Sequence, residues 1–148
     1  MNTPELLAAL EGTPDKLTAA VASLSDAQLH QRTPAGEFSP VENVCHLRDL
    51  EIEGYGIRIK RIIAEDNPSL TDFDGGKIAA ERDYNSQDPH AALEAFTRAR
   101  KSNIECLRAG NSAVLDRRAT LEGVGSISLK DLLKMMREHD DGHLQTLL

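Results

Sequence analysis

SPVENVCHLRDLE, residues 39–51, contains the clearest helix start in the chain, and the predicted fold is built around it. Ser39 is a favoured N-cap residue, and Pro40 suits the first helical position. Glu42 stands three residues after Ser39, as in a capping box, where side chain and backbone satisfy each other reciprocally. The pattern therefore predicts a long helix that starts here and runs to about Glu65.

Three more helices are predicted around this segment. The first covers residues 6–24, where Gly12, Thr13 and Pro14 either kink the helix or divide a short turn from it. The third opens at Asp88 and Pro89 and is closed by Gly110, and the fourth starts at Ser128 and continues to the chain end. No convincing strand appears between them. Gly54 and Gly56, inside the second helix, indicate close packing against a neighbour.

These elements predict an all-α fold, a four-helix bundle formed by a single domain over residues 1–148. Aromatic residues make up 3% of the chain and tryptophan is absent, so the core must be aliphatic, which suits a bundle better than a sandwich or barrel. The connections between helices 2 and 3 and between helices 3 and 4 are long. Either can hold a crossover, so the up-down order of the helices stays open.

Charge and hydropathy exclude several classes of function. The net charge of −7 argues against nucleic-acid binding, which needs a basic face. No signal peptide and no apolar run of membrane length are visible, so we expect a cytoplasmic protein without membrane contact. Its two cysteines, Cys45 and Cys106, are expected to be reduced and to act as small hydrophobic residues rather than as a disulfide.

Three histidines are the strongest candidates for a functional site. His139 and His143 are four residues apart, which on a helix places them one turn apart on the same face. His46 lies about two turns into the second helix. If helices 2 and 4 are antiparallel neighbours, the three rings lie at similar depth and can share one divalent metal. The alternative is that the pair only complements the dipole at a helix C-terminus.

Nearby charged residues suggest roles around such a site. Asp49 and Glu53 follow His46 by one and two turns and are candidates for a fourth ligand or a supporting partner, or else are ordinary surface charges. Asp140 stands where zinc peptidases of the HExxH type carry their general-base glutamate, but aspartate is shorter, so a peptidase is not expected. Arg100 lies on the apolar stripe of helix 3, where an ion pair with an inward carboxylate is expected.

At these residues the chain resembles the DinB-like family of metalloenzymes. The resemblance rests on SLSDAQLHQRTPAGEFSPVENVCHLRDLE, on FTRAR in helix 3, and on ISLKDLLKMMREHDDGHLQTL. It implies a four-helix bundle that holds one divalent metal on His46, His139 and His143. Relatives are often dimers, and some transfer low-molecular-weight thiols or isomerise thiol adducts. Phe38 departs from the family pattern, because relatives frequently carry tryptophan there.

The expected function is therefore that of a metal-dependent enzyme holding Zn²⁺ or Ni²⁺. The metal would activate a thiol or a water for attack on a small electrophilic substrate, with thiol S-transfer preferred over hydrolysis. Asp49 and Asp140 are expected to orient groups or handle protons. We expect a homodimer whose partners are a small-molecule substrate and a low-molecular-weight thiol. The alternatives are a non-catalytic metal- or ligand-binding stress-response protein and a helical dimerisation module.

Overall fold

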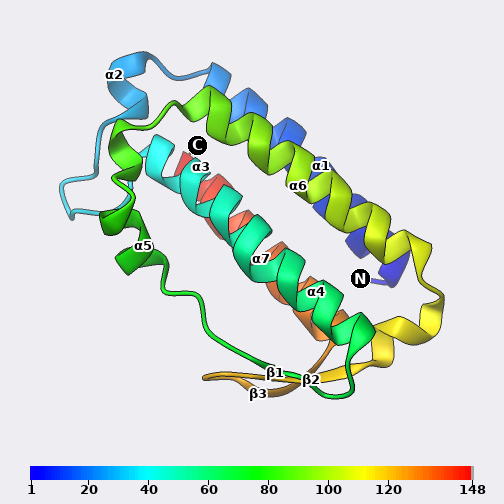
Figure 1. Ribbon diagram of the computed structural model, residues 1–148. Coiled ribbons are helices and arrows are strands. Elements are labelled where there is room, and N and C mark those ends of the chain that lie inside the picture. The colour runs from blue at the N-terminus through cyan, green and yellow to red at the C-terminus, as the bar shows by residue number, and fades with distance from the viewer. Residues whose placement is uncertain (148) are drawn as a thin grey trace.

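Four long helices lie side by side in the computed structural model, which describes residues 1–147 (Figure 1). The first is α1 (Thr3–Ala22), and the second is a continuous rod made of α3 (Pro40–Asp49), a π-helical segment η1 (Leu50–Tyr55) and α4 (Gly56–Ala64). The third and fourth are α6 (Pro89–Ala109) and α7 (Leu129–Leu147). The predicted four-helix bundle is confirmed. The predicted continuation of the last helix to residue 148 lies outside the described residues.

The helix starts are set by local capping, as predicted. Ser39 accepts a hydrogen bond from the backbone N–H of Glu42 at 3.2 Å, and the Glu42 carboxylate accepts one from the Ser39 N–H at 3.0 Å. Ser128 and Asp131 form the same reciprocal pair at the start of α7. Helix α1 runs without a break through Pro14, so the Gly-Thr-Pro sequence does not divide it.

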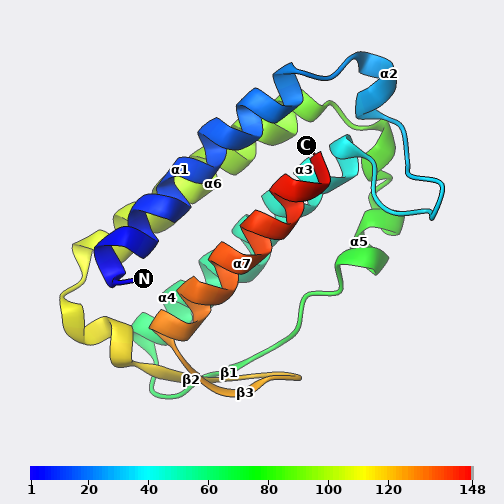
Figure 2. The ribbon, with the colours of Figure 1, turned by 180° about the vertical axis from the view of Figure 1, so that it is seen from behind.

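The order of the bundle is up-down-down-up. Figures 1 and 2 show α1 running antiparallel to both the second rod and α6, which are parallel to each other, while α7 returns alongside α1. The segment between residues 65 and 88 therefore travels back along the length of the bundle before α6 begins. This is the crossover that the long second connection allows. It also makes the second rod and α7 antiparallel neighbours, as the site hypothesis requires.

The π-helical segment lets the second rod turn one carboxylate inward. At its end the Gly56 N–H donates to the Glu51 carbonyl, five residues back, and the Glu51 side chain is buried. A Cβ on Gly56 would lie 2.8 Å from the Glu51 carbonyl oxygen and 3.1 Å from Oδ1 of Asn103. Gly56 therefore permits the close approach of α6, which is the packing role expected for it.

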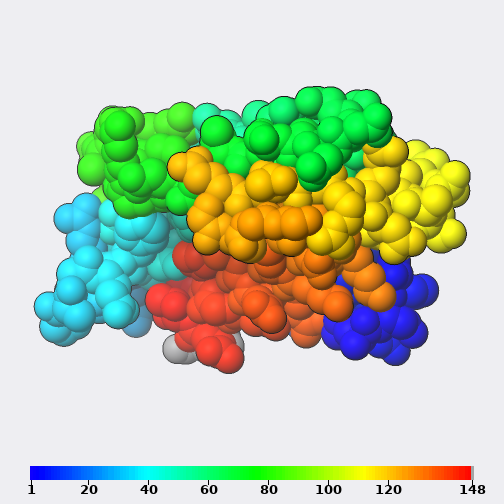
Figure 3. Space-filling model, turned by 90° about the horizontal axis from the view of Figure 1, so that it is seen from below, coloured from blue at the N-terminus to red at the C-terminus, as the bar shows by residue number. Residues whose placement is uncertain are grey.

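The sequence predicts a brief helical turn over residues 25–29 with Ser25 as its cap, and the structure has it as α2 (Asp26–Leu29). Beyond this turn, the connections contain more structure than the sequence suggested. Short helices α5 (Gly75–Glu81), η2 (Tyr84–Ser86) and η3 (Ser112–Asp116) stand between the long ones. Strands β1 (Ser69–Leu70), β2 (Arg118–Leu121) and β3 (Gly125–Ser128) form a small mixed sheet. The expectation of no strands was wrong. Figure 3 shows residues of this sheet on the surface between the segment near residue 70 and α7.

The sheet was missed because its strands have only two to four residues each. Alternation of buried and exposed residues is present in β2, but over four positions it is too short to separate a strand from a loop. The turn between β2 and β3 uses Gly123 and Gly125 at φ of 80° and 107°, a backbone conformation that favours glycine.

Two hydrophobic clusters form the core, one toward the sheet and one toward α2. Between them lies a layer of buried polar side chains from all four long helices: Thr13, Glu51, Arg100, Asn103 and Asp140. The Arg100 guanidinium bonds to Glu51 at 2.8 Å and to Asp140 at 2.7 Å, and each of the three side chains is at most 1% exposed. The predicted ion pair of Arg100 is confirmed. It joins two inward carboxylates rather than one.

Within residues 1–147, no helix combines the length and the apolar character needed to cross a membrane.

Candidate metal centre

The three predicted histidines meet between α3 and α7. One ring nitrogen from each of His46, His139 and His143 lies within 4.8 Å of the other two. Nε2 of His139 is 3.2 Å from Nε2 of His46 and 3.1 Å from Nε2 of His143. Because α3 begins where α7 ends, an early turn of one helix faces the last turns of the other. This antiparallel placement is the geometry that the spacing required.

Asn43 fixes the orientation of the His143 ring. Oδ1 of Asn43 lies 2.5 Å from Nδ1 of His143, and Nδ2 of Asn43 donates to the carbonyls of Phe38 and Ser39 at 3.4 and 3.0 Å. Since the amide nitrogen is committed to carbonyls, the amide oxygen must accept, and Nδ1 of His143 must carry the proton. The lone pair of its Nε2 then points into the cluster.

Burial keeps the three rings uncharged at neutral pH. Desolvation lowers the pKa of His46 to about 4, and repulsion from His143 adds to this effect. Desolvation lowers the pKa of His139 to about 3, again with repulsion from the other two rings. Burial also lowers the pKa of His143. Neutral imidazole is the form that binds a metal, so protons offer little competition for the three rings at neutral pH.

The arrangement fits a divalent metal better than it fits a hydrogen-bonded cluster. Nε2 of His139 carries either a proton or a lone pair, so it makes one good hydrogen bond and leaves its second close neighbour unsatisfied. Two nitrogens at ~2.05 Å from a tetrahedral Zn²⁺ are ~3.3 Å apart, close to the spacing here. Nitrogen donors at these separations can hold one ion and leave a position open.

A hollow beside the histidines gives small molecules access to them. It has a volume of about 570 Å³, and its lining includes His139, His143, Glu37 and Phe38. The Phe38 ring lies 5.9 Å from the His46 ring, centroid to centroid, and adds an apolar wall where the family resemblance expected a larger tryptophan. A site that is open on one side and closed by the bundle on the other can take a small substrate.

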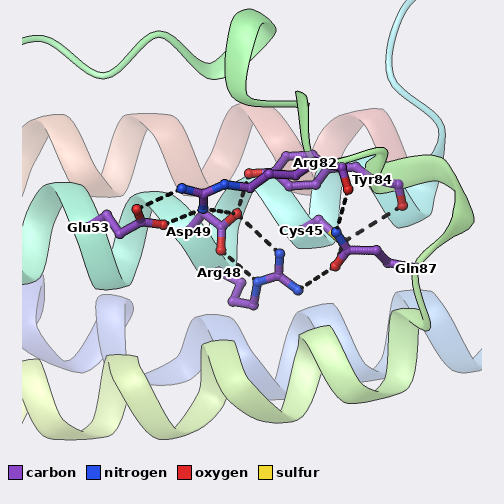
Figure 4. Close-up of polar contacts among 7 residues, drawn as sticks. All are labelled: Cys45, Arg48, Asp49, Glu53, Arg82, Tyr84 and Gln87. Atoms are coloured by element: carbon purple, nitrogen blue, oxygen red, sulfur yellow. Dashed lines mark hydrogen bonds and ion pairs between the residues drawn. The ribbon is translucent and has the colours of Figure 1, made fainter. Parts of the chain in front are cut away.

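Asp49 is not brought into the cluster of ring nitrogens. Its carboxylate accepts hydrogen bonds from Arg48 at 2.7 Å, from Arg82 at 2.9 Å and from the Tyr84 hydroxyl, as Figure 4 shows. Glu53 faces the same way and binds Arg82 at 2.9 Å. Burial alone would raise the pKa of Asp49, but bonds from Arg48 and Tyr84 outweigh it and hold this pKa below its usual range. Both carboxylates thus fasten the segment after α5 to the second rod.

Asp140 is also outside the cluster, although it follows His139 directly. Its side chain lies ~100° around α7 from that of His139, and it accepts bonds from Arg100 at 2.7 Å and from the Thr13 hydroxyl at 2.7 Å. The structure therefore brings together His46, His139 and His143 and gives Asp49 and Asp140 ion-pair partners elsewhere.

Two contributors were not found by sequence reasoning. Asn43 lies one turn before His46 in the same capped helix, and that spacing was a usable signal. Tyr84 comes from the long connection, whose path the sequence did not reveal. His30 and His90, which lie outside the cluster, are exposed. Cys45 is buried in the core and both cysteines are free among residues 1–147, as expected.

Comparison with known proteins identifies the family. Residues 9–147 match the model of the DinB superfamily, and the chain belongs to that superfamily. The resemblance read from the sequence is thereby confirmed. It covers the two segments that supply the histidines.

Two relatives add detail. A curated protein of Geobacillus thermodenitrificans, named "Putative metal-dependent hydrolase", is 34% identical over 85 residues, which are 57% of this chain and 47% of that protein. The match thus spans about half the length of the curated relative. A solved structure, described as "YfiT from Bacillus subtilis is a probable metal-dependent hydrolase with an unusual four-helix bundle topology", superposes with a TM-score of 0.87. At 23% identity, over 99% of this chain and 87% of that one, it shows the fold.

Proposed function

We propose that this protein binds one divalent metal ion through His46, His139 and His143 and uses it in an enzymatic reaction on a small electrophilic substrate. The observation that carries the proposal is the convergence of three neutral Nε2 atoms, with separations of 3.1 and 3.2 Å about His139. A metal bound there would act as a Lewis acid and lower the pKa of a water or thiol that joins it.

Hydrolysis is the reaction we place first. The names of the Geobacillus protein and of YfiT both refer to metal-dependent hydrolases. The family resemblance to thiol transferases supports thiol S-transfer as the second choice. Three imidazole ligands suit Zn²⁺ first and Ni²⁺ second. The homodimer implied by the resemblance stays a prediction, for which sedimentation velocity is the test.

The residues of this chain would contribute binding and orientation. Asn43 holds the His143 ring with its lone pair inward, and burial keeps all three rings neutral. The hollow beside Phe38 would admit the substrate, and its lining includes the carboxylate of Glu37. In this scheme Asp49 and Asp140 are positioning residues, because their ion pairs fix the helices that carry the histidines.

The direct test is metal content. Protein purified after growth with Zn²⁺ is expected to contain about one equivalent per chain by mass spectrometry, and the triple variant His46→Ala, His139→Ala, His143→Ala is expected to contain close to none. His90→Ala, which changes an exposed histidine outside the cluster, is the control and should retain the metal. Equal metal content in the wild type and the triple variant would end the proposal.

A second candidate is a non-catalytic metal site that stabilises the bundle. It is favoured by the engagement of Asp49 and Asp140 in ion pairs, which leaves neither carboxylate beside the ring nitrogens. Both candidates predict that Zn²⁺ at 100 times its Kd stabilises the fold by about 2.7 kcal/mol, which a thermal melt with and without chelator measures. Zinc-dependent turnover of p-nitrophenyl acetate, with or without added cysteine, supports the enzyme; a melting shift without turnover supports the second candidate.

A further inference from the structure

The ring of His46 packs against the backbone of Gly75, the first residue of α5. A Cβ placed on Gly75 would lie 2.6 Å from Cε1 and 2.8 Å from Nδ1 of His46, closer than real carbon atoms approach. Gly75 does not have a positive φ, so its backbone conformation alone would accept any residue. The space taken by the imidazole is what requires glycine at this position.

His46 differs from His143 in how its orientation is set. A metal-binding histidine usually donates its second ring N–H to an oxygen, as His143 does to Asn43. Nδ1 of His46 is buried and has no hydrogen-bond partner among residues 1–147. Its ring is instead surrounded by Gly75, by Phe38 at 5.9 Å and by Phe73 at 6.1 Å between centroids. Packing therefore replaces the missing hydrogen bond.

The backbone at Gly75 has little freedom to retreat from the ring. Asp74 caps α5 by accepting the Lys77 N–H at 3.1 Å. Just beyond α5, Arg82 binds Asp49 and Glu53 on the rod that also carries His46, and Tyr84 bonds to Asp49 (Figure 4). The start of α5 is thus tied, through its own cap and the contacts that follow it, to the element whose histidine it touches.

We propose that Gly75 is a positioning residue for the metal site: its lack of a side chain lets α5 seat the His46 ring with Nε2 toward His139. The inference rests on the proposed function, because a ring needs this placement only if it binds a metal. Any side chain at position 75 would push the imidazole out of line with the other two.

The experiment compares Gly75→Ala with Gly76→Ala in the full chain. The second variant is a matched control, since both residues lie in the first turn of α5 and a Cβ on Gly76 has nothing closer than Asp74 Oδ1 at 3.9 Å. Competition titration with Zn²⁺ is expected to show about tenfold or greater loss of affinity for Gly75→Ala and less than twofold for Gly76→Ala. In the metal-free proteins, the NMR signal of the His46 Cε1–H group should move only in Gly75→Ala.

The outcomes separate this inference from the proposed function. If the wild type binds Zn²⁺ no better than Gly75→Ala, the proposed role of Gly75 is overturned, but the proposed metal site is not. Wild-type protein that binds no Zn²⁺ would overturn both. If Gly75→Ala does not fold, Asp74→Ala replaces it, because it frees the start of α5 without adding an atom. Weakened Zn²⁺ binding in Asp74→Ala supports the inference, and wild-type affinity refutes it.

Discussion

At the scale of single residues, the site depends on how each imidazole is held rather than on the histidines alone. His143 is oriented by one hydrogen bond, whereas His46 and His139 have buried Nδ1 atoms without a partner in the described part of the chain. The ring of His139 lies 4.4 Å from that of His143 and 6.1 Å from that of Tyr55, between centroids. Among residues 1–147, Asn43 is therefore the one polar side chain that sets a tautomer in this cluster.

Replacing Asn43 by leucine is expected to weaken Zn²⁺ binding about 10- to 100-fold, because Nδ1 of His143 loses its acceptor and the ring can turn. Competition titration gives the affinity. Asn43→Asp keeps an acceptor oxygen while losing the amide donor, and should therefore bind Zn²⁺ more tightly than Asn43→Leu. Equal affinities for the two variants would show that the helix-start contacts of Asn43, and not its bond to His143, are what matter.

At the scale of elements, helices could be predicted and the segments between them could not. Ser39, Ser128 and Asp88 mark helix starts because capping involves residues within one turn of each other. The partners of Asp49 come from residues 82 and 84, whose position depends on the path of a long connection. A carboxylate one turn beyond His46 therefore looked like a metal ligand, because the sequence did not reveal the cations that bind it.

The contacts of Asp49 predict that the attachment of the segment after α5 to the second rod depends on pH. The pKa of Asp49 is lower in the folded protein than its ordinary value of 3.8, so the unfolded chain takes up its proton first as pH falls. The stabilisation is fully present above pH 3.8 and is lost as pH falls through the folded pKa.

Urea unfolding of the wild type and Asp49→Asn, measured across this range, checks the sign. The wild type should be more stable at pH 6, and the difference should shrink progressively below pH 4, because the unfolded wild-type chain then takes up a proton at Asp49 that the folded protein binds only at lower pH. A difference that stays constant down to pH 3 would mean that the charge of Asp49 contributes nothing.

At the scale of the whole molecule, the polar layer around Arg100 divides the core into two apolar halves. The sequence placed Arg100 correctly on the inward stripe of the third long helix, α6, because spacing on a regular helix is predictable. It did not anticipate Glu51 as a partner, because the π-helical segment changes which residues of the second rod face inward. Regular periodicity fails at such an insertion.

Arg100→Met is expected to destabilise the fold by about 3–5 kcal/mol, because two buried carboxylates would lose the cation they share. Chemical denaturation measures the loss. Arg98→Met on the same helix is the control: its pair with Glu94 is exposed on both sides and should contribute less than about 1 kcal/mol. If the two substitutions cost the same, the layer is not a determinant of stability.

The π-helical turn has a consequence for comparing this chain with its relatives. Each residue of an α-helix turns the side-chain direction by ~100°. One added residue therefore changes which face of the helix the later residues occupy relative to the earlier ones. The histidine-bearing stretch before it and the apolar stretch after it can then be aimed at different neighbours. An alignment of this chain with a homologue that lacks this π-helical turn would need a one-residue gap at residues 50–55. Without the gap, the inward carboxylates of the two chains would be aligned with the wrong residues.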